Sequence, residues 1–406
     1  MRNTLLLLFC LSLLSCEQEK QQVLPGYKEF STYHEFIKTL KEVANLTVEN
    51  SPNLLLDAFW DSLGVNNRIP FVIGDSVAFL YRGTSSNVSW AGDFNGWSAT
   101  NSAFRGERIG LSDVWLMEKV FPSDARLDYK IVAGTQWILD PVNTHIQYSG
   151  FGANSELRMP QWQFPSETKL AEGVNRGQVS NTISIISSAT NLGYSVQYKV
   201  YTPYGYENLN QLPVMYVTDG HEYSDDKLGA MVIVLDNLIH QGDIQPIIVV
   251  FVDPRNPNNL SENRRMQEYT GNIKFANFLA DELVPVIDVN YKTSQSADAR
   301  GILGTSLGGW NSAYIGLMRS DVFHLIAIHS PAFNNTIIQS YNASPKLPLK
   351  IFMSTGVIYD TQDKARAMKA VFESKDYELN YIEVNQGHSW GNWRALLQEP
   401  LQFFFQ

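Results

Sequence analysis

From residue 182 to the C-terminus, short apolar runs rich in Val and Ile alternate with stretches of helical periodicity. Strands that are apolar along their whole length are buried on both faces, which requires helices on both sides of a mostly parallel sheet. The predicted strands are 214–217, 247–252, 302–303, 325–328, 349–353 and 381–384. The predicted helices are 228–240, 273–289, 307–318, 363–374 and 393–405. Residues 182–406 are therefore predicted to form an α/β domain.

Upstream of residue 182 the apolar residues follow a different pattern. From about residue 69 the apolar period shortens towards two, and Gly, Asn, Asp and Pro separate the short runs. These runs, at 77–81, 88–91, 114–117 and 127–132, predict a small antiparallel β-sandwich of Ig-like type over residues 68–160. Residues 17–67 are predicted to form a polar tether and a helical segment, and the Pro- and Gly-rich residues 161–181 a linker.

The first 16 residues are predicted to be a lipoprotein signal peptide. Arg2 precedes an apolar run over 5–14 that is too short to span a bilayer but suits a signal peptide. Ser15-Cys16 resembles a lipoprotein box, in which Cys16 would be acylated; an ordinary cleaved signal is the alternative. We therefore expect an exported protein that a lipid anchors to a bacterial envelope membrane, on its periplasmic side or at the cell surface. Both cysteines lie in this leader, so no disulfide is expected in the mature domains.

Composition narrows the range of partners. The formal net charge is −10 and there is no basic run, which argues against nucleic acid as a partner. Aromatic residues reach 12%, including nine Trp, which suits stacking on sugars or phenolic rings, although β-rich cores use the same residues. No zinc-like Cys/His spacing, dinucleotide fingerprint or P-loop occurs, so neither a metal nor a cofactor is expected.

The segment Gly304-Thr305-Ser306-Leu307-Gly308 lies between a predicted strand and a predicted helix. A serine hydroxyl is a weak nucleophile unless a sharp turn exposes it to a base and amide donors await the developing oxyanion. The flanking glycines permit a strained strand–turn–helix, and the helix N-terminus adds positive potential. The pattern predicts Ser306 as a nucleophile.

A base and an acid are expected downstream, in the chain order Ser, acid, His. His388 follows the last predicted strand and precedes the last predicted helix, which makes it the candidate base. The candidate acid is Asp360, which follows the predicted strand 349–353, and Asp363 is the alternative because it lies nearby. Asp363 could instead cap the next helix. His329 ends a predicted strand and is interpreted as a neighbour of the site, not as the base.

An oxyanion hole needs two N–H groups close to the nucleophile. One is expected to be the amide of Leu307. The other is expected from the loop after the predicted strand 214–217, where Gly220 would let the backbone approach the substrate closely. Whether Gly220 or His221 supplies this amide is open from the sequence.

A polar loop after the predicted strand 247–252 carries two adjacent arginines, Arg264 and Arg265. Loops at the carboxyl ends of parallel strands border active sites, so this pair could bind an acidic or catechol-bearing substrate. The arginines could equally pair with Glu262 and Glu268 to hold the loop. Together with Trp390, which lies beside the candidate base, they are the candidate substrate-binding residues.

The segments 304–309, 387–394 and 263–269 resemble the esterase D-like α/β-hydrolases, above all the enterochelin-esterase-like and feruloyl-esterase-like group. The resemblance extends from about residue 179 to the C-terminus. It implies an α/β-hydrolase fold and hydrolysis through an acyl-enzyme, with Ser306, His388 and an acid at Asp360.

The predicted sandwich also resembles a known family. Residues 88–97 and 129–141 are similar to the isoamylase N-terminal domain, or family-48 carbohydrate-binding module. That resemblance implies the fold and a carbohydrate contact by the sandwich, although the same Trp/Phe/Asn turn can serve packing alone. Residues 151–157 resemble the junction of bimodular esterases, which implies a sandwich packed beside the catalytic cleft.

These features predict a serine carboxylic-ester hydrolase that needs no cofactor. Its expected substrates are feruloyl or acyl esters of carbohydrate, or siderophore esters of the enterochelin type. One alternative is a mycolyltransferase-like acyltransferase of the same fold, which would pass the acyl group to a sugar. The other is a non-catalytic glycan-binding lipoprotein.

Overall fold

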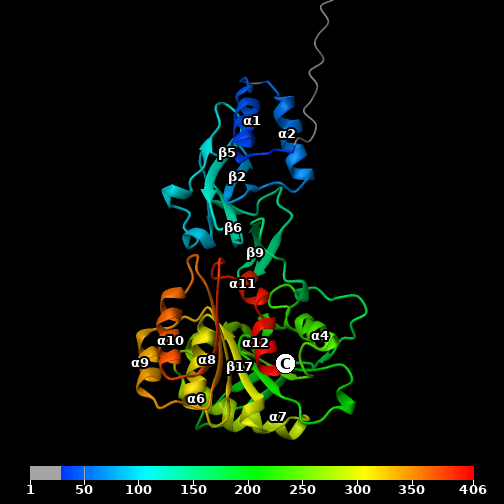
Figure 1. Cartoon of the computed structure of the whole chain (residues 1–406), viewed down its shortest axis with the longest axis vertical. Coiled ribbons are helices and arrows are strands. Elements are labelled where there is room, and N and C mark those ends of the chain that lie inside the picture. Colours follow the sequence, from blue (N-terminus) through cyan, green and yellow to red (C-terminus); the bar gives the residue numbers. More distant parts are fainter. Residues whose placement is uncertain (1–28, 50) are drawn as a thin grey trace, which may run out of the picture.

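The computed structural model describes residues 29–49 and 51–406. The predicted signal peptide, the tether and Cys16 lie outside the described residues. Within the described ranges, no helix combines the length and the apolar character needed to cross a bilayer. The chain forms an upper β domain and a lower α/β domain (Figure 1), so the predicted α/β-hydrolase fold preceded by an antiparallel β domain is confirmed.

The upper domain contains two antiparallel sheets. The first has the order β1-β2-β5-β4, with β1 (Phe71–Ile73), β2 (Ser76–Arg82), β5 (Val114–Val120) and β4 (Glu107–Arg108). The second has the order β3-β6-β9-β8, with β7 paired to β6: β3 (Val88–Gly92), β6 (Arg126–Ala133), β9 (Gly152–Arg158), β8 (Ile146–Ser149) and β7 (Gln136–Ile138). Side chains between the sheets, such as Phe79, Trp90 and Tyr129, form their common core.

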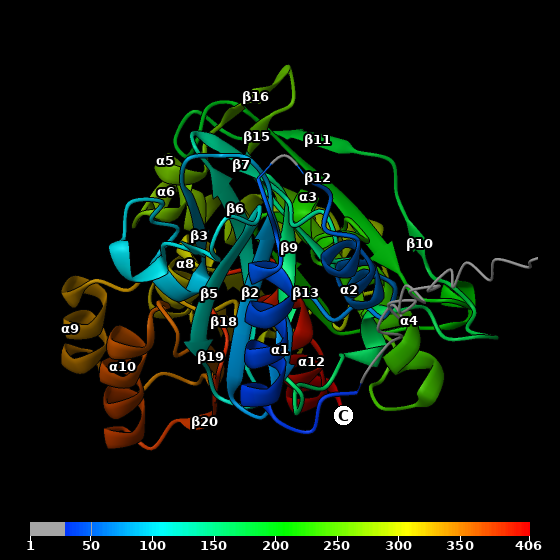
Figure 2. The same ribbon diagram turned by 90° about the horizontal axis from the view of Figure 1, so that it is seen from above.

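Two helices cover the outer face of the first sheet (Figures 1 and 2). They are α1 (Tyr33–Asn45) and α2 (Leu54–Val65), and their N-termini are capped by the side chains of Thr32 and Asn53. Because successive side chains of a strand face opposite sides, β2 is buried on both faces. Phe79 points between the sheets, whereas Leu80 packs under the helices. The helical segment thus completes the β domain.

A nine-stranded mixed sheet forms the centre of the lower domain. Its order is β10-β12-β14-β13-β17-β18-β19-β20, and β11 pairs with β12. The strands are β10 (Gln178–Val179), β11 (Ile183–Ile186), β12 (Ser195–Thr202), β14 (Ile248–Asp253), β13 (Val214–Val217), β17 (Arg300–Thr305), β18 (Leu325–His329), β19 (Lys350–Gly356) and β20 (Glu378–Val384). From β14 to β20 all neighbours are parallel, so the carboxyl ends of these strands meet at one edge.

Helices cover both faces of this sheet, as its apolar strands require. One face carries α3 (Gly220–Tyr223), α4 (Met231–Gln241), α11 (Trp390–Ala395) and α12 (Gln398–Phe405). The other carries α6 (Ile273–Asn277), α7 (Val284–Asn290), α8 (Leu307–Met318), α9 (Asn335–Ala343) and α10 (Gln362–Ser374). In β13, Tyr216 belongs to one core and Met215 to the other, so the two cores lie on opposite faces of the sheet.

Several predicted elements differ in detail. The predicted helix 273–289 is divided into α6, a π-helical stretch (Phe278–Leu283) and α7, with Pro285 in the first turn of α7. Pro has no N–H to donate, which favours a break in the regular ladder at this point. The predicted helix 393–405 is divided into α11 and α12. Several elements were not predicted, and β12 and α9 are the longest of them; β12 alternates apolar residues with Gln197 and Lys199, so its apolar signal is diluted.

Candidate active site

The loops at the carboxyl edge of the sheet hold four non-glycine residues with positive φ. They follow four adjacent strands, β13, β17, β18 and β19, and are Asp219 (φ 53°), Ser306 (φ 57°), Ser330 (φ 40°) and Tyr359 (φ 50°). Such backbone strain persists only where the surroundings enforce it, and it concentrates at functional sites. This edge of the sheet is therefore the candidate active site.

Ser306 stands alone between β17 and α8, with φ 57° and ψ −115°. Its amide donates to the carbonyl of His329 (2.9 Å), which ties the turn to the neighbouring strand β18. A Cβ at Gly304 would overlap the backbone of Gly308, and one at Gly308 would lie 2.8 Å from the Thr218 hydroxyl. Both glycines are thus required by close approach of the strand, the turn and the helix.

Three side chains from separate loops form one hydrogen-bonded chain. His388 Nε2 lies 2.8 Å from Ser306 Oγ, and His388 Nδ1 lies 2.6 Å from Asp360 Oδ1. The other carboxylate oxygen of Asp360 accepts from the Ser330 hydroxyl and from the Gly356 amide, both at 2.6 Å. Both oxygens of this fully buried carboxylate are therefore engaged, which fixes its orientation towards the imidazole.

The alternative acid and the second histidine occupy other positions. Asp363 is exposed in the first turn of α10, where it complements the positive end of the helix. His329 is buried at the end of β18, and its Nδ1 lies 2.8 Å from Ser354 Oγ. Burial lowers the pKa of His329 to about 3, so the ring is neutral. The geometry favours Asp360 over Asp363 as the partner of His388.

The candidate oxyanion donors begin two helices. Leu307 is the first residue of α8, and the first N–H groups of a helix have no partner within it. Gly220 and His221 begin α3, between Asp219 and Glu222, which both line the cavity above Ser306.

The expectation that Gly220 serves close approach of the substrate is wrong. A Cβ at Gly220 would overlap the backbone of Phe251 in β14, so the glycine permits close helix–strand packing and not close approach of a substrate. The imidazole of His221 does not line the cavity; its Nδ1 lies 3.3 Å from Asp253 Oδ1. These two residues therefore remain candidates through their backbone amides alone.

A cavity of about 660 Å³ lies above Ser306. The α/β domain contributes Asp219, Glu222, Asn263, Arg265, Ser306, His388, Ser389, Trp390 and Trp393 to its lining. The β-sandwich contributes Trp97, Asp128, Lys130, Trp137, Ser149, Gly150, Phe151 and Asn154. The site is thus formed between the two domains, and two of the sandwich aromatics stand open to it: Trp137 is 46% exposed and Phe151 is 99% exposed.

Two of the three candidate substrate-binding residues line the cavity, and one does not. Trp390 lines the cavity, as does Arg265, which pairs with both carboxylate oxygens of Asp219 at 2.9 Å. Arg264 is outside the cavity lining: its guanidinium lies over the Tyr194 ring (4.1 Å to the centroid) and donates to Glu262 (3.1 Å). Arg264 therefore holds its loop, and the prediction that it binds substrate is not supported by its position.

Charge in the cavity is mostly neutralised by pairing. Arg265 is bound to Asp219, and Asp128 is bound to the buried Arg126. Burial raises the pKa of Glu222 to about 7, and burial also raises the pKa of Asp128 to about 7. The Lys130 side chain makes no ion pair or hydrogen bond with the residues that the structure describes. The cavity therefore offers one unpaired cation, several aromatic faces and weakly acidic carboxyl groups.

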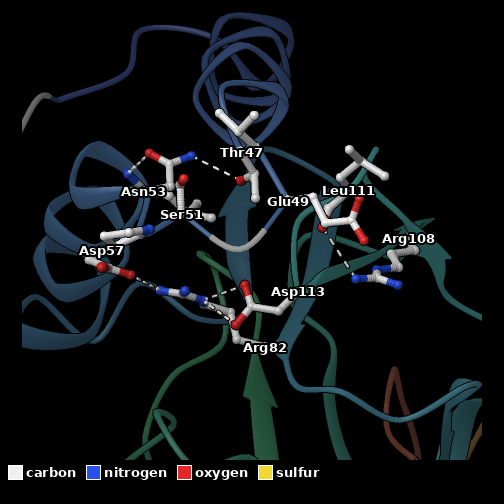
Figure 3. Close-up of a pocket in the computed structure, with 12 residues that line it drawn as sticks. Thr47, Glu49, Ser51, Asn53, Asp57, Arg82, Arg108, Leu111 and Asp113 are labelled. Carbon is white, nitrogen blue, oxygen red and sulfur yellow. Dashed lines mark hydrogen bonds and ion pairs between the residues drawn. The ribbon is translucent and has the colours of Figure 1, made fainter.

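A second hollow lies at the far end of the sandwich, beside α1 and α2 (Figure 3). Three of its charged side chains pair with one another: Arg82 donates to Asp57 (2.8 Å) and to Asp113 (2.9 Å). Arg108 donates to backbone carbonyls, including that of Leu111 (3.2 Å). It contains no histidine or cysteine, and no group of acidic, His or Cys residues suited to a metal occurs in residues 29–49 and 51–406. Chemistry is therefore assigned to the cavity above Ser306.

Comparison with known proteins agrees with this location. Residues 189–364 match the family model "Putative esterase". The matched stretch lies in the α/β domain and includes Ser306 and Asp360. An endo-1,4-beta-xylanase/feruloyl esterase of Xylanibacter ruminicola is 26% identical over 309 residues, which is 74% of this chain. The match spans 41% of that protein, so the chain corresponds to less than half of the relative's length.

Solved structures resemble both domains of this chain. The enterobactin esterase of Shigella flexneri, solved with enterobactin, has a TM-score of 0.67 at 20% identity and covers 80% of this chain and 92% of its own. The ferric enterobactin esterase of Salmonella typhimurium has a TM-score of 0.69 at 19% identity, covering 83% and 95%. At these identities the likeness establishes a shared two-domain fold.

Proposed function

We propose that the protein hydrolyses carboxylic esters through a catalytic triad of Ser306, His388 and Asp360. The observation that carries the proposal is the continuous chain from Ser306 Oγ through the imidazole to Asp360, with bonds of 2.8 and 2.6 Å. Its position on a strained turn at the carboxyl edge of the sheet supports the same role.

The proposed reaction follows from this geometry. His388 Nε2 accepts the Ser306 proton as Oγ attacks the ester carbonyl, and Asp360 holds the remaining ring proton on Nδ1. The amide of Leu307, with that of Gly220 or His221, stabilises the oxyanion. His388 then protonates the leaving alcohol, and the acyl group stays on Ser306. Water attacks this acyl-enzyme with His388 again as base, which releases the acid and restores the serine.

The cavity favours an uncharged aromatic acyl ester of carbohydrate over a siderophore ester. Trp97, Trp137 and Trp390 offer ring faces for a phenolic acyl group or a sugar. A ferric catecholate carries several negative charges, which Lys130 alone would have to balance, because Arg265 is paired with Asp219. Burying unbalanced charge is costly.

A substrate panel tests this choice. We expect a feruloylated xylan fragment to have a kcat/KM at least tenfold higher than that of a cyclic catecholate ester. Trp137→Ala should lower kcat/KM for the feruloylated fragment by about tenfold, through loss of about 1.4 kcal/mol of aromatic contact, and change it less than twofold for p-nitrophenyl acetate. Tyr204→Ala, an exposed aromatic outside the cavity, is the matched control. The opposite substrate ranking would favour the siderophore esters.

Acyl transfer is distinguished by its product. An acyltransferase of this fold would form an acylated sugar when a sugar acceptor is added at millimolar concentration, whereas the proposed hydrolase releases free acid under the same conditions. A purely glycan-binding protein would not react with a fluorophosphonate. We expect covalent labelling of the wild type and loss of labelling in His388→Ala, because the reagent needs an activated serine.

We further propose that Cys16 carries the lipid anchor and holds the enzyme at an envelope membrane. Expression of the full chain in bacteria supplied with radiolabelled palmitate should give a labelled band in the membrane fraction. Cys16→Ser should lose the label, because acylation needs the thiol, and leave the esterase activity of the whole lysate unchanged. Equal labelling of both proteins would contradict a lipid at this position.

A further inference from the structure

The turn that carries His388 is bonded to the β-sandwich on its N-terminal side. The Arg126 amide, at the start of β6, donates to the carbonyl of Asn385 (3.2 Å), and Arg126 forms an isolated parallel bridge with Gln386. The side-chain amide of Asn385 donates to Asp124 Oδ1 (2.7 Å). The backbone that enters the turn is therefore registered against a strand of the other domain.

The Arg126 side chain holds the other end of the turn. Its guanidinium is fully buried and pairs with Asp128 and Glu156 inside the sandwich. Its Nη1 donates to Ser389 Oγ (3.1 Å), and a Cβ at Gly391 would overlap the guanidinium. Because the two carboxylates fix the guanidinium, it presents a rigid donor to the residue that directly follows His388.

Asp93 contacts the turn at Gly387, the residue before His388. A Cβ at Gly387 would overlap the Asp93 side chain, and Asp93 Oδ2 accepts from the Asp128 amide (2.9 Å). Asp93 is buried in the first turn after β3 and is thereby tied to β6. Gly387 and Ser389, on either side of His388, thus both touch buried, fixed side chains of the sandwich.

We infer that the β-sandwich is a positioning element for the base: Arg126, Asp93 and Asp124 hold the turn 385–389 so that His388 Nε2 stays within reach of Ser306 Oγ. The inference rests on the proposed role of His388. Bonds from its own domain also hold the turn, among them the Ile358 amide to the Gln386 carbonyl (3.2 Å) and Asn392 Nδ2 to the Gly387 carbonyl (3.0 Å), and the contacts of the sandwich add to them. A displacement of about 1 Å at a reacting group can lower the rate about 10²-fold, so these contacts bear directly on kcat.

Two substitutions test the positioning role. Arg126→Lys keeps the positive charge but cannot reach Asp128, Glu156 and Ser389 together, because an ammonium is a point charge and not a fork. We expect kcat for p-nitrophenyl acetate to fall at least tenfold with KM changed less than twofold. Asp124→Ala removes the exposed bond to Asn385 and should lower kcat about threefold, and Asp124→Asn, which keeps an acceptor oxygen, should restore it.

Matched controls come from the far end of the same sandwich. Arg82→Lys and Asp113→Ala alter an ion pair of similar kind that does not contact the turn, and both should keep wild-type kcat. The rate of fluorophosphonate labelling reports activation of Ser306 without a substrate pocket, so it should fall in parallel with kcat. Circular dichroism verifies the fold of each variant.

The outcomes separate the inference from the proposed function. Wild-type kcat and labelling rate in folded Arg126→Lys and Asp124→Ala would overturn the positioning role. If Arg126→Lys does not fold, the comparison of Asp124→Ala with Asp124→Asn decides, because Asp124 is exposed and its bond to Asn385 lies at the surface. A wild-type enzyme that is not labelled at all would contradict the proposed serine chemistry instead.

Discussion

Replacing Ser306 with Ala should lower kcat for p-nitrophenyl acetate and for a feruloylated sugar by about 10⁴-fold. The substitution removes the atom that forms the acyl-enzyme and leaves His388 with no hydroxyl to deprotonate. Residual hydrolysis would come from water and the oxyanion donors. The fold should persist, because no hydrogen bond of the Ser306 side chain other than that to His388 occurs among the described residues. Initial-rate kinetics and thermal unfolding of the pure variant measure both effects.

The control for this variant is Ser374→Ala. That serine is exposed in the last turn of α10, and its hydroxyl donates to the carbonyl of Val371 (2.8 Å), far from the nucleophile in the fold. Mass spectrometry of the fluorophosphonate-treated wild type should place the adduct on the peptide that contains Ser306. An adduct on another serine, or a Ser306→Ala enzyme with near wild-type turnover, would refute the proposed nucleophile.

The nucleophile turn was accessible from the sequence because its constraints are local. A strand, a tight turn and a helix follow one another within 300–318, and the glycines at 304 and 308 mark the close approach that the structure contains. His388 and Asp360 were accessible for a related reason, since each follows a strand whose apolar run can be recognised. Chain order then restricts the candidates to a few residues.

The sandwich half of the cavity was not predicted residue by residue. Lys130, Trp137 and Phe151 lie in segments whose family resemblance concerns the fold and the domain junction, and their approach to Ser306 depends on how two domains pack. The same holds for Gly387 and Gly391, whose need for glycine comes from Asp93 and Arg126 in the other domain. Contacts between distant segments leave no periodic signal, so only the similarity of 151–157 to an esterase junction pointed to this arrangement.

At Gly220 the sequence indicated the need for a glycine but not its cause. The sequence indicated a glycine near the oxyanion site, and close approach to substrate is a common reason for one. In the structure the missing side chain makes room for the backbone of Phe251. A glycine shows that something comes close, and the identity of the neighbour follows from tertiary packing.

Asp360→Asn should lower kcat by about 10³- to 10⁴-fold, and the contacts of the carboxylate explain why. Oδ2 accepts hydrogen bonds from Ser330 Oγ, from the Gly356 amide and, at 3.5 Å, from Asn392 Nδ2, so an asparagine must place its oxygen there. Its NH₂ group then faces His388 Nδ1, which has to accept a hydrogen bond. The ring proton therefore moves to Nε2, where it blocks transfer from Ser306.

The variants of Asp360 and Asp363 should also follow an order of activity. Asp360→Ala leaves the imidazole free to choose its tautomer, so it should retain at least as much activity as Asp360→Asn. Asp363→Asn should stay within twofold of the wild type, because Asp363 is exposed in the first turn of α10. Steady-state kinetics and the fluorophosphonate labelling rate of the three folded variants measure the order. A large loss in Asp363→Asn with near-normal Asp360→Asn would move the acid of the triad to position 363.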